Sequence, residues 1–135
     1  MKTQNFLAEN LLTAVKETLA QSRSWLECTK TLTKIETALE AVVKPYFYKR
    51  RDLITSYSAP DEKTWNLVVP TDKQDEFTKK MDELSQEECE LNIELPVVLK
   101  TDNDKMFSDK FHNAFLKLVG EENYKIEKPE AEVQK

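Results

Sequence analysis

Glycine is nearly missing from this 135-residue chain, which contains only Gly120. The phosphate-binding loops of nucleotide enzymes need several residues without a side chain, so the sequence excludes the P-loop and dinucleotide-binding classes. Histidine is equally scarce: His112 stands alone, and no multi-histidine metal site can form. The two cysteines, Cys28 and Cys89, are too few for a disulfide framework and lack zinc-ligand spacing. We therefore expect no cofactor, no metal and no catalytic site.

Long apolar runs are also missing, because no stretch approaches the roughly 20 residues that a membrane span requires. Hydrophobic residues make up 39% of the chain and charged residues 33%, a balance that suits neither a disordered chain nor a membrane protein. Acidic residues outnumber basic ones by 25 to 20, which gives a net charge of -5 and disfavours nucleic acid unless the basic groups cluster. The composition predicts a soluble, acidic protein of the cytoplasm.

What the sequence does contain is helical periodicity. Residues 4–20 carry the apolar stripe of an amphipathic helix. A second seam, spaced alternately by three and four residues, predicts a long helix from about residue 24 to 57. Pro45 interrupts the hydrogen bonding of that helix, and we expect a kink or a break there. The seam resumes in register after Pro45, which favours a kinked continuous helix over two separate helices. The seam consists of Trp25, Cys28, Leu32, Ile35, Leu39, Val42, Tyr46, Leu53 and Tyr57.

The second half of the chain predicts a returning helix and some short elements. Thr71 and Gln74 match a capping box, which predicts a helix over about residues 72–88 that pairs with the long helix as an antiparallel hairpin. In that arrangement Cys28 and Cys89 lie too far apart for a disulfide. The alternating residues 91–95 predict a short strand.

A short helix should follow, capped by Ser108 and ended by Gly120. The predicted fold is mainly α, a coiled-coil-like antiparallel helical hairpin with flanking short helices and at most one short strand pair. Residues 1–120 should form a single helical domain, and residues 121–135 a mobile charged tail.

Two short motifs carry a resemblance to a known group of proteins. An R-x-x-L-I-x-x-Y pattern ends at Tyr57, and an E-L-N-I segment occupies Glu90 to Ile93. In this respect the chain resembles small proteins of tailed bacteriophages that have no assigned chemistry. The resemblance covers about residues 11–119 and implies a helical hairpin in a phage setting, without a mechanism.

Isolated titratable groups read as surface residues. His112 has no carboxylate or nucleophile at a suggestive spacing, and we expect an ordinary helix-surface histidine. Asp102–Asp104 begins like a calcium loop, but Phe107 replaces the required glycine and Asn113 the bidentate glutamate. The acidic group Glu87, Glu88 and Glu90 has no apolar surroundings that would tune its pKa values for catalysis.

One basic cluster interleaved with aromatic residues stands out, consisting of Lys44, Lys49, Arg50 and Arg51. Such a composition suits phosphate contacts and base stacking. The helical seam passes through the same turns, so we expect most of the aromatic side chains to serve in packing.

The long seam is longer than the helix over residues 72–88 that returns along it. The part around Trp25, Cys28 and Leu32 therefore needs another cover, either from residues 4–20 of the same chain or from a partner, including a second copy. Trp65, in the loop between the two helices, is a further aromatic anchor. These four residues form the predicted protein interface.

We interpret the chain as a non-enzymatic phage protein that acts through protein–protein contacts, as a virion structural or assembly component in the host cytoplasm or the particle. Two alternatives stay open: a small inhibitor or modulator of a host protein, and nucleic-acid binding through Lys44 to Arg51. We expect no membrane contact and no small-molecule substrate.

Overall fold

The computed structural model describes residues 1–21, 26–101 and 107–127, and the fold is mainly helical, as the periodicity predicts. Three two-stranded sheets accompany the helices in the described part. The helices are α1 (Asn5–Ala20), α2 (Leu26–Tyr57), α3 (Gln74–Gln86) and α4 (Asp109–Val119), with 3-10 turns η1 (Thr71–Lys73) and η3 (Glu121–Asn123). The strands are β1 (Lys2–Gln4), β2 (Ala59–Pro60), β3 (Leu67–Val68), β4 (Glu88–Glu90), β5 (Val97–Lys100) and β6 (Tyr124–Glu127).

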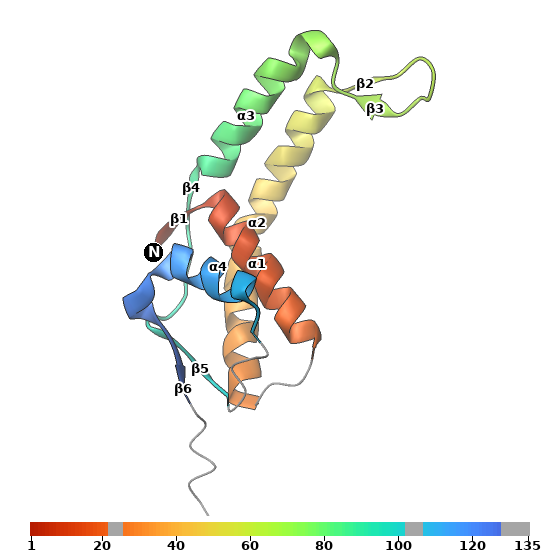
Figure 1. Ribbon diagram of the computed structural model, residues 1–135. Coiled ribbons are helices and arrows are strands. Elements are labelled where there is room, and N and C mark those ends of the chain that lie inside the picture. The colour runs from red at the N-terminus through yellow and green to blue at the C-terminus, as the bar shows by residue number, and fades with distance from the viewer. Residues whose placement is uncertain (22–25, 102–106, 128–135) are drawn as a thin grey trace, which may run out of the picture.

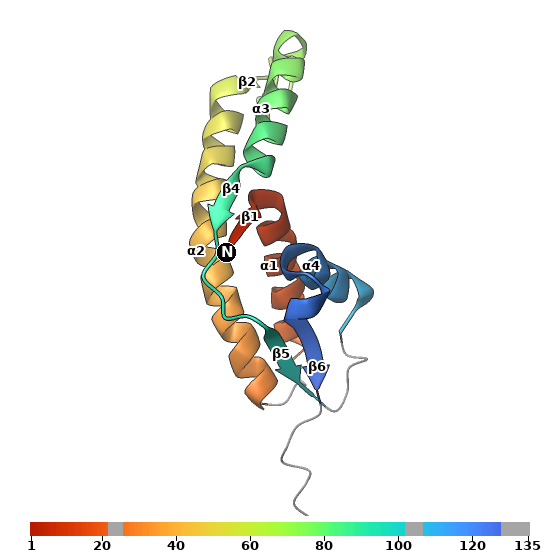
Figure 2. The ribbon, with the colours of Figure 1, turned by 90° about the vertical axis from the view of Figure 1, so that its left-hand side faces the viewer.

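Helices α1 and α2 pack as a hairpin, and α4 lies across α1 (Figures 1 and 2). This part, with the sheets β1–β4 and β5–β6, is called the body below. Its core joins the first half of the α2 seam to α1 and to the aromatic face of α4. The largest fully buried side chains are Phe111, Phe115, Leu11, Leu32, Leu39, Leu91, Leu99, Val15, Val43 and Cys28.

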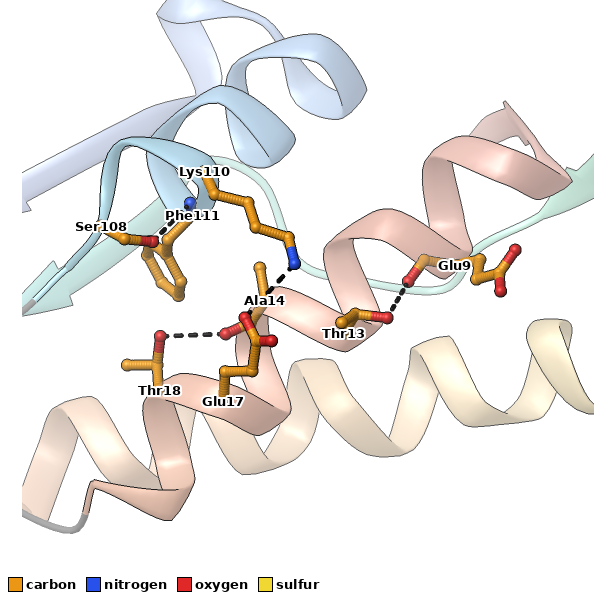
Figure 3. Close-up of polar contacts among 8 residues, drawn as sticks. All are labelled: Glu9, Thr13, Ala14, Glu17, Thr18, Ser108, Lys110 and Phe111. Carbon is orange, nitrogen blue, oxygen red and sulfur yellow. Dashed lines mark hydrogen bonds and ion pairs between the residues drawn. The ribbon is translucent and has the colours of Figure 1, made fainter.

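The start of α4 follows the sequence prediction closely. The hydroxyl of Ser108 accepts the backbone N–H of Phe111 at 3.1 Å, which caps the first turn (Figure 3). Lys110 then reaches across to Glu17 of α1 at 3.4 Å. Gly120, with φ 86°, ends the helix in a conformation that favours glycine.

Helix α2 runs unbroken through Pro45, so the expected continuous helix is confirmed. The buried stripe drifts slightly from the predicted seam, because Val43 is buried and Val42 only half-buried. A straight α-helix repeats every 3.6 residues, so a seam spaced by 3.5 rotates away from its partner along the helix. After Tyr46 the seam is only partly covered: Leu53 and Tyr57 are half-buried.

Residues 47–86 project from the body as an arm, made of the end of α2, the β2–β3 hairpin and α3 (Figures 1 and 2). Helix α3 returns along α2 as the predicted hairpin partner, and Tyr57 faces Phe77 with ring centroids 5.8 Å apart. The arm has little core of its own, since Leu84 is the one buried residue of α3. The predicted capping box is not formed: the side chain of Gln74 donates to the carbonyl of Val69.

The strand predictions need correction, because three strand pairs form in the described part where at most one is expected. The sequence predicts one strand over residues 91–95, but that segment is not a strand, and the strands β4 and β5 lie on either side of it. Strand β4 pairs antiparallel with β1, and β5 pairs parallel with β6. Leu91 and Ile93 alternate because both face the core from an irregular segment, which produces the same period as a strand.

The predicted tail also begins too early. Residues 121–127 form η3 and β6, and Tyr124 packs on Phe115 with centroids 4.8 Å apart. The expectation of a mobile tail is therefore wrong for residues 121–127, whose alternating Tyr124 and Ile126 side chains find partners in the body. Residues 128–135 lie outside the described part.

Candidate protein-interaction surface

The predicted interface around the start of the α2 seam is buried within the chain. Cys28 and Leu32 are both 0% exposed, because α1 and α4 belong to the same core as this part of α2. Of the two expected covers for this part of the seam, residues 4–20 of the same chain are therefore the one that the structure shows. Trp25 lies outside the described residues. Of the four predicted interface residues, only Trp65 is placed on the surface.

The outer end of the arm carries the most exposed apolar side chains of the described chain. Trp65 is 80% exposed and Leu67 is 64% exposed, with the exposed Val68 beside them. We call residues 59–68, the β2–β3 hairpin and its loop, the tip; it extends sideways from the top of the arm (Figure 1). An aromatic and aliphatic patch of this kind, clear of the body, is the composition found at the centre of protein interfaces.

Four hydrogen bonds organise the tip loop. Asp61 makes two backbone bonds, donating to Asn66 and accepting from Trp65, each at 2.8 Å. Its carboxylate also accepts the hydroxyl of Thr64 at 2.9 Å, and that hydroxyl accepts the backbone N–H of Asn66 at 3.3 Å. Asp and Thr side chains commonly fold turns in this way. The loop therefore presents Trp65 from a defined backbone rather than from a loose chain.

Trp65 itself has an unusual backbone conformation, with φ 62°. This left-handed region costs an L-residue roughly 1–2 kcal/mol and normally holds glycine, asparagine or aspartate. Such strain at an exposed residue gains nothing from core packing. Backbone outliers of this kind cluster at functional positions, which makes Trp65 the residue of the tip most in need of a functional explanation.

The chain is net acidic in and just after the apolar tip. From residue 59 to 76 the chain has five acidic and two basic residues. Glu62 is exposed in the tip loop, and Asp61 is half-exposed beside it. A complementary surface would combine an apolar recess with basic residues at its rim.

The basic cluster of α2 is divided by the structure. Arg50 binds Glu9 of α1 at 3.0 Å, and Lys49 lies 3.6 Å from Glu87. Lys44 and Arg51 are exposed on another face, where the guanidinium of Arg51 lies over the ring of Tyr48 at 5.3 Å. Of the four residues of the predicted nucleic-acid contact, only Lys44 and Arg51 are therefore exposed without an acidic partner among the described residues.

His112 contributes to packing rather than standing free on the surface. Its Nδ1 lies 2.7 Å from the hydroxyl of Tyr124, and its ring meets Phe107 and Phe111 edge-on. Burial raises the pKa of the Tyr124 phenol well above its usual range. The pair connects α4 to β6 and forms no recognisable catalytic arrangement with a third group.

In the acidic group Glu87, Glu88 and Glu90, at and just before β4, two carboxylates are paired: Glu87 with Lys49 and Glu90 with the amino terminus. Glu90 lies 2.7 Å from the amino group of Met1, whose hydrogen bond and charge lower the pKa of that carboxyl. Among the described residues, no group of three or more His, Cys, Asp or Glu side chains could hold a metal ion. The segment at residues 102–106, which begins like a calcium loop, lies outside the described residues.

Comparison of the chain with protein-family models, with curated proteins and with solved structures gave no match. Within the described ranges, no helix is both long and apolar enough to cross a membrane. The resemblance to small phage proteins stays a prediction.

Sequence reasoning found Trp65 but missed its neighbours. Leu67 and Val68 belong to a β-prone run, and such runs are usually buried. The signal that could have found them is the combination of that run with Pro60 and Pro70 on either side, because proline disfavours long strands. The two strands are in fact only two residues each. A strand pair this short has no second layer to cover it, so its apolar residues stay exposed.

Proposed function

We propose that the chain is a non-enzymatic protein-binding protein that makes contact through the tip of its arm. The observation that carries the proposal is Trp65, an 80% exposed indole held at φ 62° by a hydrogen-bonded loop. Exposed aromatic residues on a prearranged backbone bind with little loss of conformational entropy. Following the resemblance to phage proteins, we propose a role as a virion structural or assembly component.

The arrangement of the fold supports this role. The body contains nearly all of the core, whereas the arm carries exposed apolar groups and little core of its own. A compact body with a projecting contact element suits a protein that connects to others. Inhibition or modulation of a host protein would use the same tip and stays the alternative.

Site-specific photo-cross-linking tests the proposal. A benzophenone amino acid replaces Trp65 in one sample and Lys117, an exposed residue of α4, in a second. Cells that produce the chain in its native setting are then irradiated. We expect adducts to a defined protein from position 65 and none from position 117. Adducts to a virion protein would support assembly and adducts to a host protein the alternative, while no protein adduct at position 65 would contradict the proposal.

A further inference from the structure

A continuous exposed face of α2 connects the middle of the molecule to the arm. Lys44, Phe47, Arg51 and Ile54 follow one another at spacings of three and four residues, so they lie on one face of the helix. All four are exposed, including the 43% exposed Phe47 and the 41% exposed Ile54. We call these four residues the α2 stripe. It alternates basic and apolar side chains.

The lower end of the stripe opens into a groove between α1 and α2. The buried Leu12 and Val43 and the exposed Phe47 line it. Lys16 and Glu40 pair across it at 2.9 Å, and Lys44 lies beside them. Its volume is about 390 Å³, within the range of about 300–1,000 Å³ of pockets that hold small ligands. The groove is apolar inside and has two lysines and one glutamate at its rim.

The groove and the tip have complementary properties. The tip offers an exposed indole with Asp61, Glu62 and Lys63 beside it, a net charge of -1, and the groove offers an apolar recess edged by Lys16, Lys44 and Glu40, a net charge of +1. Glu40 could accept the indole N–H, which otherwise has no partner within the described chain. Charge complementarity of this kind selects partners and orients them.

Within one chain the tip does not reach the groove. The helix between Lys44 and Tyr57 is about 20 Å long at 1.5 Å per residue, and the tip lies beyond its end. The β2–β3 hairpin and the second half of α1 nevertheless lie on the same side of α2 (Figure 1). A second copy whose α2 runs antiparallel, paired about the middle of the stripe, would place each tip at the groove of the other.

We propose that two copies of this chain associate through their arms, with Trp65 of each copy in the α1–α2 groove of the other. The inference rests on the proposed contact role of the tip and names the partner as a second copy. The two α2 stripes pack on each other between the two contacts. A two-fold interface is self-complementary, so both contacts form or neither does.

Exchange of charges gives a sharp test. Glu62→Lys places a lysine opposite Lys44, and Lys44→Glu places a glutamate opposite Glu62, so each variant alone carries two repulsive contacts. An equimolar mixture allows a dimer of one copy of each variant. In that dimer one tip–groove contact has both charges reversed and the other is native, so both contacts are attractive. Lys117→Glu on α4 makes the same change of charge as Lys44→Glu away from the arm and serves as the control.

Sedimentation velocity is measured up to about 1 mM, the weak end of ordinary protein affinities. We expect dimers for the unmodified chain and for Lys117→Glu, monomers for each arm variant and for Trp65→Ala, and dimers again for the mixture. A monomeric unmodified chain would overturn the inference, as would dimers that no arm variant affects. Circular dichroism of each variant confirms that it is folded.

Two further results would separate this inference from neighbouring ideas. If the unmodified chain is monomeric while position 65 still cross-links to another protein, the contact role of the tip stands and self-association fails. If Lys44→Glu instead removes salt-dependent binding of a mixed-sequence single-stranded oligonucleotide and leaves sedimentation unchanged, the stripe binds nucleic acid and the inference is overturned.

Discussion

The backbone N–H of Trp65 donates to the carbonyl oxygen of Asp61 at 2.8 Å, and this bond closes the loop around a tryptophan with φ 62°. The chain thus maintains an unfavourable backbone conformation at a side chain that contributes nothing to the core. Loop strain and exposure coincide in one residue. This coincidence distinguishes the tip from the scattered exposed apolar residues of an ordinary surface.

The positive φ of Trp65 predicts that glycine is a more stable replacement than alanine at this position, the reverse of the usual order. At φ 62° alanine keeps the left-handed penalty and glycine does not, so Trp65→Gly should be more stable than Trp65→Ala by about 1 kcal/mol. The free energy of unfolding in urea measures the difference. Lys63, at a negative φ, provides the control: there alanine should be the more stable replacement. Equal stability of the two variants at position 65 would show that the loop is not strained.

Burial of the α2 seam predicts a clear contrast in stability. Leu32 is 0% exposed, and truncation to alanine should cost about 2–5 kcal/mol of unfolding free energy. Lys34, exposed two residues further along, should tolerate alanine with a change below about 0.5 kcal/mol. Leu32→Glu should unfold the chain. A folded, monomeric Leu32→Glu protein would restore the start of the seam as an interface.

The thin core of the arm predicts local opening. Leu84 is the one buried residue of α3, whereas α2 places several buried residues in the body. Amide hydrogens of α3 should therefore exchange faster than those of α2 between Cys28 and Val43. Phe77→Ala, which removes the ring contact with Tyr57, should accelerate exchange in α3 further and leave α4 unchanged. Uniform exchange across arm and body would contradict this division.

The buried thiol of Cys28 predicts a dependence of stability on high pH. Burial raises the pKa of Cys28 from 9.0 to about 11, so folding favours the neutral thiol. Its contribution is fully present below about pH 9 and is lost as the pH rises through about 11. The unfolding free energy should fall over that range. Tyr124, whose pKa is raised from the ordinary value of 10.0, adds to the fall only above about pH 10.

Cys28→Ala isolates the thiol from the phenol. The variant should be less stable at pH 8, because a buried group is truncated, but its stability should fall less steeply between pH 9 and 11. Urea unfolding at each pH provides the comparison. Parallel pH profiles for the two proteins would contradict the assignment to Cys28.

The helices could be predicted because each is encoded locally. The spacing of Leu32 and Leu39 places them on one buried face, and Ser108 and Gly120 bound α4 as expected. The strands could not, because β1 pairs with β4 and β5 with β6 across long stretches of chain. A local pattern does not tell which distant segment supplies the other half of a ladder.

The interaction surface was half predictable for a related reason. Trp65 lies in a polar loop, so its exposure follows from its neighbours. Cys28 and Leu32 lie on an apolar seam, and a seam needs a cover without specifying whether α1 or another chain provides it. The division of the basic cluster depends on Glu9 and Glu87, which reach Arg50 and Lys49 only through the tertiary fold.

The most direct measurement is the accessibility of the Trp65 indole to acrylamide, monitored by quenching of its fluorescence. A Trp25→Phe protein is used, so that Trp65 is the one tryptophan that emits. At low concentration, where we expect a monomer, Trp65 should be quenched nearly as strongly as free tryptophan. As concentration rises and copies associate, quenching should fall severalfold, and Lys44→Glu should abolish that change. A protected indole in the monomer, or full quenching in the associated state, would contradict the account that the tip is the contact surface.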